Sequence, residues 1–460
     1  MAPRNEEEKS LSVERDVDVP EEKAAKQPRI DNGLSLRNQI TAAPRQTRAW
    51  ETFRAVGAPQ FHVAPMVDQS ELAFRMLCRN HGATAAYTPM IHSRLYAEGG
   101  DKFCDETFST TVADRPLFVQ FCANDPDVLV KAAKKVQATV DAMPADADGK
   151  RAGIDYVDLN LGCPQRIAKR GNYGAFLMDD LKLVSRIVKT ATSTLSIPMS
   201  CKIRCFDSVE ETVRYATMLV ECGCSVLGVH GRTREQKDLK ATRADWDKIK
   251  AVVDAVGSRV PVIANGNVRH YDDAIALMNY TGANGVMSAE GLLSDPALFS
   301  RRVRAGVASM TSVDEAMAQR TRYSEPDPST AEPVGALWPA SGTEGCDLLR
   351  EYLELTREYA TPMRMVRAHA HRMLGEWLKE FHDVRDKLVR CLGTPEEYRN
   401  QLLEVSDDLR ACIVRTERDF PVEKLTDRAL RRLEEANELE ERKAEAIRQQ
   451  AAEESMLASL

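Results

Sequence analysis

Eight short apolar runs alternate with amphipathic helical segments between residues 58 and 300, and this alternation constrains the fold more than any other feature. Strands that alternate with helices predict a parallel sheet covered by helices. Eight such units match a (β/α)8 TIM barrel. An open doubly wound sheet is the alternative, but the count of eight and the polar residues that follow most runs favour the barrel. The predicted strands are residues 61–65, 84–88, 117–121, 156–160, 199–203, 226–230, 260–264 and 285–288, and the predicted helices between them include 125–140, 179–190, 209–222, 243–256 and 272–281.

The composition changes on both sides of this region. We predict an α/β fold in which residues 55–305 form the TIM barrel, followed by a C-terminal helical domain and flanked by charged, partly disordered tails. Residues 1–45 are charged and lack apolar periodicity, so we expect them to be disordered. Proline and glycine mark residues 306–345 as a linker. Residues 346–415 are predicted to be the helical domain, and residues 416–460 a charged helix or tail without a heptad repeat. The helices expected in this part are 344–359, 362–381, 384–390 and 395–410.

Composition also limits the class of protein. The 460 residues contain 11 cysteines at irregular spacing, which indicates neither a disulfide scaffold nor a paired zinc site, so we expect reduced thiols and no metal. No apolar run reaches the roughly 20 residues that cross a bilayer, and no signal peptide is visible. We therefore expect a monomer without a membrane partner, in the cytoplasm or nucleus. The net charge of −7 does not indicate a nucleic-acid binder, but phosphates respond to local patches of charge.

Polar or special residues follow nearly every predicted strand, where the active site of a barrel lies. Each of them alone has a structural explanation: Lys202 in a buried ion pair, or His230 as a satisfied core histidine. The set as a whole favours a functional site. Lysine in a barrel mouth can neutralise an anion such as the N1 region of a reduced flavin. The residues are Pro65, Met66, Gln120, Asn160, Lys202, Arg204, His230, Arg232, Asn265, Gly266, Asn267, Ala289 and Glu290.

The last two predicted strands are followed by small, glycine-containing loops. Barrels often bind phosphate there, because backbone N–H groups can approach the anion closely. The alternative is that Gly266 and Gly291 only make tight turns.

Cys163 lies between Gly162 and Pro164, three residues after Asn160. At a barrel mouth its thiol can act as a nucleophile or as a proton donor. A lone cysteine in a loop is more often structural. The residues that follow it include Arg166, Lys169 and Arg170, which could close over an anionic substrate.

A second basic group falls in the helical domain. Arg364, Arg367 and His371 are spaced by three and four residues and share one helix face. This face could contact phosphates. Taken alone, an ordinary solvated face is the simpler explanation.

Several motifs in order resemble the tRNA-dihydrouridine synthases. They are APMVD at 64–68, NLGCPQ at 160–165, KRGNYGAFL at 169–177, MSCKIR at 199–204, HGRT at 230–233 and NGN at 265–267. The stretches RTREQK at 232–237 and GVMSAEG at 285–291 resemble the eukaryotic tRNA-dihydrouridine(16/17) synthase branch. Many bacterial members have Gly-Arg where this chain has Ala289-Glu290, which leaves a phosphate contact there to backbone N–H groups.

The resemblance implies an FMN-binding barrel and a tRNA-binding helical domain. It implies that NADPH or NADH reduces FMN, that hydride goes to C6 of a uridine at D-loop positions 16 and 17, and that Cys163 protonates C5. It places Asn160 and Arg232 near flavin and uracil. The implied FMN contacts are Pro65, Met66, Val67, Gln120, Lys202, His230, Asn265, Gly266, Asn267, Ala289 and Glu290.

Three other functions fit parts of the sequence. An FMN barrel that reduces a small molecule would share the flavin loops but needs no basic helical domain. A non-catalytic tRNA-binding protein would not need Cys163, Lys202 and His230 together. A flavin-free phosphate-binding lyase leaves Cys163 and Gln120 without a role.

Overall fold

The computed structural model describes residues 48–237, 243–300 and 343–419. The predicted tail 1–45 lies outside these residues. So do the predicted linker 306–345, apart from its last three residues, and all but four residues of the predicted tail 416–460. In the described part, no helix is both long and apolar enough to cross a membrane.

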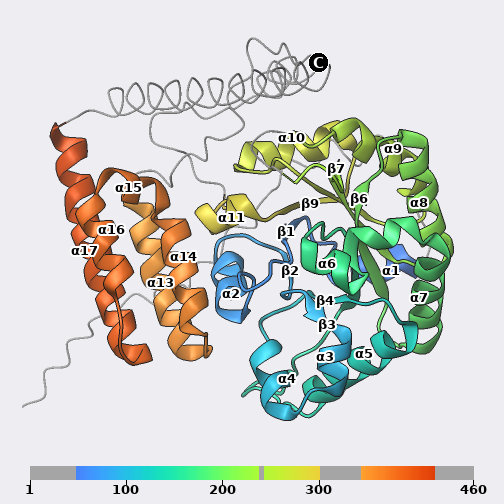
Figure 1. The fold of residues 1–460 in the computed structure, drawn as a ribbon, viewed down its shortest axis with the longest axis horizontal. Helices are drawn as coiled ribbons and strands as arrows, with labels where there is room; N and C mark the ends of the chain where they lie inside the picture. The colour runs from blue at the N-terminus through green and yellow to red at the C-terminus, as the bar shows by residue number, and fades with distance from the viewer. Residues whose placement is uncertain (1–47, 238–242, 301–342, 420–460) are drawn as a thin grey trace, which may run out of the picture. The chain divides into compact units, whose positions relative to one another are not determined.

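A closed parallel barrel forms the larger part of the described chain, as the sequence predicts (Figure 1). Each of the eight predicted runs is a strand, and the strands pair in chain order around the barrel. The ring closes where β1 pairs with β9 and β2 pairs with β4. The barrel strands are β1 (Phe61–Val63), β2 (Ala85–Tyr87), β4 (Leu117–Cys122), β5 (Tyr156–Leu161), β6 (Met199–Cys205), β7 (Val226–Thr233), β8 (Val262–Asn265) and β9 (Gly285–Ser288).

Helices cover the outside of the barrel, and four of the longer ones begin at a residue whose side chain caps them. The Asp125 carboxylate accepts from two backbone N–H groups at the start of α5, and the side chains of Asp180, Ser208 and Asp245 each accept from one at the start of α7, α8 and α9. The cap at Asp245 is why the helix predicted from residue 243 begins at Trp246. The helices of this part are α1 (Arg48–Ala55), α2 (Leu72–Asn80), α3 (Ser93–Glu98), α4 (Asp101–Thr107), α5 (Pro126–Asp141), α6 (Arg166–Gly171), α7 (Leu181–Thr194), α8 (Val209–Glu221), α9 (Trp246–Val256), α10 (Tyr271–Thr281) and α11 (Glu290–Ser294), with a 3-10 helix at Gly174–Asp179.

The structure adds a short ninth strand that the sequence analysis missed. β3 (Ile91–His92) pairs with β4 beyond the end of β2, and α3 and α4 follow it. Two residues are too few to show strand periodicity, so β3 could not be predicted from the sequence.

Stacked aromatic rings fill the barrel near the N-terminal ends of β4 and β5. The ring of Phe118 lies 4.5 Å from that of Tyr87 and 4.5 Å from that of Tyr156, nearly parallel to both. His62 adds an edge contact to Phe118, and burial lowers the pKa of His62 to about 4. This ring layer is the floor on which the polar residues of the site lie.

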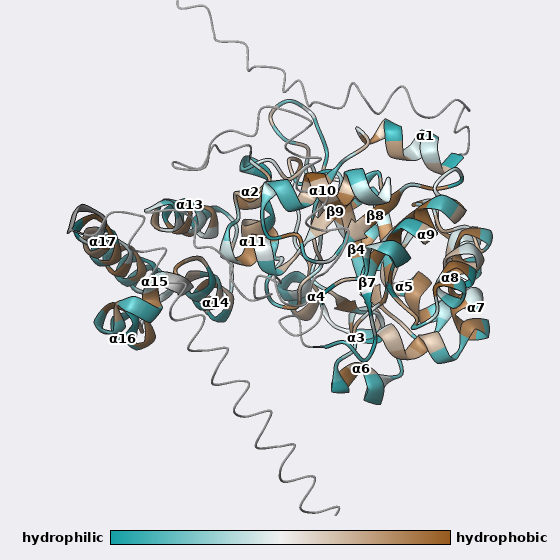
Figure 2. Ribbon diagram, turned by 90° about the horizontal axis from the view of Figure 1, so that it is seen from above, coloured by the Kyte–Doolittle hydropathy of each residue, from teal (hydrophilic) through white to brown (hydrophobic). Residues whose placement is uncertain are grey.

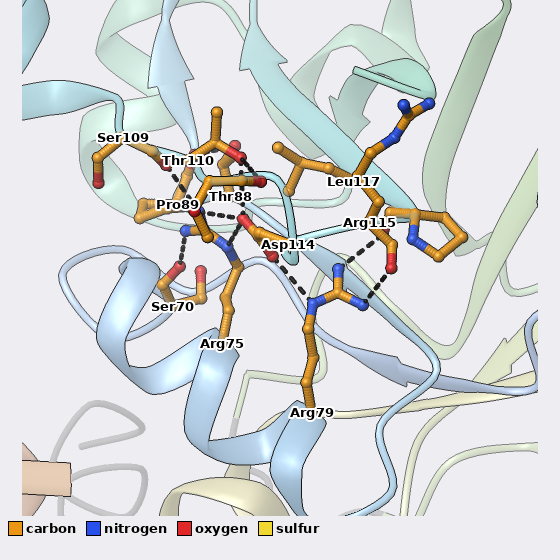
Figure 3. Close-up of polar contacts among 12 residues, drawn as sticks. Ser70, Arg75, Arg79, Thr88, Pro89, Ser109, Thr110, Asp114, Arg115 and Leu117 are labelled. Carbon is orange, nitrogen blue, oxygen red and sulfur yellow. Dashed lines mark hydrogen bonds and ion pairs between the residues drawn. The ribbon is translucent and has the colours of Figure 1, made fainter. Parts of the chain in front are cut away.

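Two arginines of α2, the buried Arg75 and the partly buried Arg79, bind Asp114, and Arg75 also holds the loop that follows β1 (Figure 3). Arg75 pairs with Asp114 at 2.7 Å, and Arg79 pairs with the other oxygen of Asp114 at 2.9 Å. Arg75 also donates to the Ser70 carbonyl at 2.7 Å, and the Ser70 hydroxyl accepts from the N–H of Met66 at 3.0 Å. The Met66 loop at the barrel mouth is therefore tied to a buried ion cluster.

The helices after residue 343 pack together and against α2 and α11. They carry hydrophobic and hydrophilic residues on different sides (Figure 2), and their apolar residues join one continuous core with the barrel. The predicted helix 362–381 is wrong in one respect: it is broken at Leu374 into α14 and α15. The predicted helix 395–410 continues as far as Asp419. The helices are α13 (Glu344–Glu358), α14 (Met363–Met373), α15 (Gly375–Glu380), α16 (His382–Arg390) and α17 (Pro395–Asp419).

Candidate active site

Polar side chains lie in layers above the aromatic floor, because alternate residues of a strand point to the same side of the sheet. The pairing of β4, β5 and β6 brings these residues side by side, one layer after another towards the carboxyl ends. The neighbours are Phe118 with Tyr156, then Gln120 with Asp158 and Ser200, then Asn160 with Lys202.

A hydrogen-bonded chain crosses these strands. Ser200 Oγ donates to Asp158 at 2.6 Å, and Gln120 Nε2 donates to the other oxygen of Asp158 at 2.8 Å. Asn160 Nδ2 donates to Gln120 Oε1 at 2.8 Å. Burial raises the pKa of Asp158 to about 6, although the bonds from Ser200 and Gln120 and the charge of Lys202 oppose this shift. Asp158 and Ser200 were not among the site residues predicted from the sequence, although both follow the same alternation as Gln120 and Asn160.

This row of hydrogen bonds ends at the backbone of Cys163. Asn160 Oδ1 accepts from the N–H of Cys163 at 2.9 Å and from that of Gly162 at 3.1 Å. The thiol is partly exposed and packs against a small cluster that includes Cys122 and Tyr173. Cys163 is thus held at the barrel mouth by a side chain anchored in the barrel interior.

Gly174 covers the other side of Cys163. Its φ is +66°, and a Cβ at this position would lie 2.8 Å from the Cys163 carbonyl oxygen and 2.9 Å from the Cys163 Cβ. The next residue, Ala175, donates its N–H to that carbonyl at 3.1 Å. Only glycine fits this close approach, so Gly174 belongs to the support of Cys163.

Four nitrogen-rich side chains converge at the ends of β6 and β7: Lys202, Arg204, His230 and Arg232. Burial, and next the charge of Arg204, lowers the pKa of Lys202 to about 8. Burial and the three cations lower the pKa of His230 well below its usual range, so His230 is neutral at pH 7. Its Nε2 lies 3.0 Å from Nη1 of Arg232. The cluster creates a positive electrostatic potential, which favours an anionic ligand.

Arg204 has a different role from the other three. It donates to the carbonyl oxygens of Gly162 at 2.9 Å, Thr233 at 2.7 Å and Gln236 at 2.9 Å. It therefore joins the loop before Cys163 to the loop after β7. Its guanidinium group binds carbonyl oxygens of the protein itself.

The loop after β8 approaches His230 closely. Gly266 has a φ of +128°, and a Cβ there would lie 2.4 Å from the Cβ of Ala244 and 3.3 Å from the His230 ring. Asn267 Oδ1 accepts from Arg232 at 3.1 Å, and Asn265 Nδ2 donates to the Met287 carbonyl at 2.9 Å. These contacts connect the carboxyl ends of β7, β8 and β9.

Comparison with known proteins decides the family. Residues 62–326 match the family described as dihydrouridine synthase (Dus). This chain belongs to the dihydrouridine synthase family. It is 41% identical over 342 residues to the rat protein named tRNA-dihydrouridine(16/17) synthase [NAD(P)(+)]-like, covering 73% of this chain and 65% of the rat protein. Against the Saccharomyces cerevisiae tRNA-dihydrouridine(16/17) synthase [NAD(P)(+)] the identity is 36% over 362 residues, with 77% and 75% covered.

Relatives that are named for other tRNA positions match a smaller part of the chain. The human tRNA-dihydrouridine(20a/20b) synthase [NAD(P)+]-like protein is 38% identical over 240 residues, which cover 52% of this chain and 69% of that protein. The chain spans 65% of the length of the rat relative and 60% of the mouse relative.

The remaining predicted cofactor positions lie around the same mouth. After β1, Met66 is buried whereas Val67 is 61% exposed. Pro65 is partly buried, and Ala289 and Glu290 follow β9, the neighbour of β1. The Glu290 side chain, however, binds Arg372 of α14 at 2.9 Å.

The basic segment after Cys163 forms α6. Arg166, Lys169 and Arg170 are exposed there, and within the described residues they make no ion pair. Their predicted contact with an anionic substrate stays a prediction, and their exposure is compatible with it.

The structure separates the three predicted residues of α14. Arg364 is 65% exposed and pairs with Asp68 at 3.0 Å. Arg367 instead donates to the Tyr398 hydroxyl at 2.8 Å and to the Cys391 carbonyl at 3.0 Å, with its guanidinium over the Tyr398 ring. His371 is partly buried, and burial and Arg367 lower its pKa. The three residues therefore do not form one exposed basic face. Arg367 instead joins α14 to α17 and to the residue that follows α16.

Proposed function

We propose that this protein is an FMN-dependent enzyme that uses NADPH or NADH to reduce uridine in the D-loop of tRNA to dihydrouridine, at positions 16 and 17. The observation that carries the proposal is the position of Cys163. A barrel of the dihydrouridine synthase family holds this thiol at its mouth, beside the cluster of Lys202, His230 and Arg232. The names of the rat and yeast relatives support the substrate and the nicotinamide.

The residues at the mouth fit FMN. Lys202 Nζ makes no hydrogen bond or ion pair with any residue that the structure describes. A partly buried cation without a partner requires an anion to offset its desolvation. Gly266 lets the loop after β8 lie directly against Ala244 and His230, which keeps the backbone N–H groups of this loop beside the cationic cluster, where a phosphate can bind.

The chemistry that bound FMN supplies is hydride transfer from NAD(P)H to C6 of the uracil ring. The protein must then deliver a proton to C5, where negative charge develops. Cys163 Sγ–H is the proton donor in our proposal, and water restores the proton afterwards. Asn160 fixes the backbone that carries this thiol, Gln120 holds Asn160, and Asp158 holds Gln120. The overall reaction consumes one NAD(P)H and one proton per uridine.

The target uridine must leave its stack to reach the mouth, because a base inside folded RNA is inaccessible. The exposed cations of α6 and α14 are available to contact the RNA backbone meanwhile. A small-molecule reductase would not need these two basic segments.

The test is to map dihydrouridine by mass spectrometry in tRNA from cells lacking this gene, restored with wild type or with Cys163→Ala. We expect dihydrouridine at positions 16 and 17 to return only with wild type, while both purified proteins retain flavin absorbance. An unchanged dihydrouridine profile in the deleted cells would exclude the tRNA reaction and favour reduction of a small molecule. A colourless protein that binds tRNA would indicate a non-catalytic binder.

A further inference from the structure

Three basic side chains of α14 meet three carboxylates of the barrel rim. Arg364 pairs with Asp68 at 3.0 Å, His369 with Glu71 at 3.0 Å, and Arg372 with Glu290 at 2.9 Å. Asp68 and Glu71 follow β1, Glu290 follows β9, and these two strands are neighbours in the barrel. The helix α14 therefore lies along one stretch of the mouth, next to α11 (Figure 1).

The middle contact, between His369 and Glu71, is buried, and we call it the buried joint. His369 is fully buried, its ring stacks on Phe74 with centroids 4.2 Å apart, and Glu71 also accepts from the Tyr352 hydroxyl at 2.7 Å. Tight packing on all sides means that this contact keeps the helix in place.

The two outer pairs are open to solvent. The side chains of Arg364 and Asp68 are 65% and 53% exposed, and those of Arg372 and Glu290 are both 42% exposed. Exposed ion pairs contribute about 0–1 kcal/mol, so another anion can displace either carboxylate at little cost. Phosphate is well suited to this, because a guanidinium binds phosphate oxygens through paired N–H groups.

We propose that Asp68 and Glu290 compete with RNA phosphates for Arg364 and Arg372. In the free protein the carboxylates hold both guanidinium groups at the barrel mouth, and on binding the RNA backbone replaces them while the buried joint stays closed. This inference rests on the proposed function, because its partner is RNA. The alternative is that the outer pairs only help to hold the two parts of the protein together.

The experiment is a double-mutant cycle on binding of an unmodified tRNA transcript to the flavin-loaded protein at fixed salt. Asp68→Asn removes the charge, and Asn tolerates the left-handed backbone found there, with a φ of 56°. We expect Asp68→Asn to lower the Kd about two- to five-fold. In an Arg364→Ala background the same substitution should have no such effect.

The matched control is Asp207→Asn. Asp207 is also exposed and follows a barrel strand, β6, but it forms no ion pair within the described residues. This control measures the general effect of removing one negative charge. A second cycle, Glu290→Gln with Arg372→Ala, tests the other pair, with flavin absorbance checked first because Glu290 lies at a predicted cofactor position.

The outcomes separate the two proposals. If Asp68→Asn tightens binding equally in both backgrounds, or no more than Asp207→Asn does, the competition is excluded. A weaker affinity for Asp68→Asn would also exclude it and favour the docking role. Binding that follows the predicted cycle in a protein that forms no dihydrouridine would exclude the proposed enzyme function alone. Absence of any tRNA binding would exclude both.

Discussion

Glu71 Oε2, on the barrel, lies 3.0 Å from Nε2 of His369 in the helical part of the chain. Burial alone would raise the pKa of Glu71, but His369 and the Tyr352 hydroxyl more than offset this, and the pKa is lowered from 4.5. The contact therefore favours the carboxylate. Its contribution to stability is present above pH 4.5 and is lost as the pH falls through the lowered pKa.

Removing this carboxylate should destabilise the protein. Breaking a buried charged contact from one side costs about 3–5 kcal/mol, so we expect Glu71→Ala to lower the free energy of unfolding by that order. Urea denaturation followed by circular dichroism at pH 7 measures it. Glu51→Ala, at an exposed position of α1, is the control and should change little. Equal stability of the two variants would show that Glu71 does not hold the helices to the barrel.

Asp158 gives the opposite dependence on pH. Its folded pKa of about 6 is above its ordinary value of 3.8, so its contribution to stability is present below pH 3.8 and is lost as the pH rises through 6. Asp158→Asn and wild type will differ in unfolding free energy at pH 4 by some fixed amount. We expect this difference to shift in favour of Asp158→Asn by about 3 kcal/mol between pH 4 and pH 7. Parallel curves of unfolding free energy against pH would contradict the raised pKa.

Gly174→Ala tests the support of Cys163. The new methyl group would meet the Cys163 backbone, so we expect dihydrouridine formation to fall at least about ten-fold while flavin stays bound. Gly149→Ala is the matched control, because Gly149 also has a positive φ, +75°, but a Cβ there meets nothing within 4 Å. Equal activity of the two variants would mean that the placement of Cys163 tolerates displacement.

Lys202 should make flavin binding sensitive to alkaline pH. Its pKa of about 8 means that the free protein loses this positive charge as the pH rises through 8, far below the usual 10.5. We expect the Kd for FMN to rise above pH 8 in wild type. Lys202→Arg should remove the dependence, because arginine stays charged. Quenching of flavin fluorescence measures both, and identical pH profiles would disprove the role of Lys202.

Arg364 and Arg367 should separate binding from stability. Arg367→Ala removes contacts to Tyr398 and Cys391, so we expect it to cost about 1–3 kcal/mol in unfolding free energy. Arg364→Ala should leave stability nearly unchanged and raise the Kd for tRNA. Thermal unfolding and filter binding distinguish them. If Arg367→Ala is as stable as wild type but binds tRNA more weakly, Arg367 contacts phosphate, as the sequence predicts, and does not mainly stabilise the helices.

Periodicity in the sequence was sufficient to predict the barrel, because eight buried strands and their helices each repeat one local pattern. It also predicted which residues gather at the mouth, since the carboxyl ends of parallel strands meet there. It could not predict the role of Arg367 or the carboxylate partners of α14. Those depend on contacts between residues up to 298 positions apart, as for Glu71 and His369, and no local pattern records them.

The roles of Gly174 and Asp158 were accessible only in part. The alternation that includes Gln120 and Asn160 also includes Asp158, so its inward position was predictable. Gly174 has no such signal, because its importance comes from the backbone of Cys163 folding against it.

The stacked rings of Tyr87, Phe118 and Tyr156 close the barrel from below. In the proposed reaction, the reactants, the products and the proton that restores Cys163 must then all pass through the same opening. A bound tRNA is far larger than a nicotinamide and would cover that opening. We therefore expect the two substrates to take turns, with the oxidised nicotinamide leaving before the RNA arrives, so that turnover follows alternating rather than simultaneous occupation.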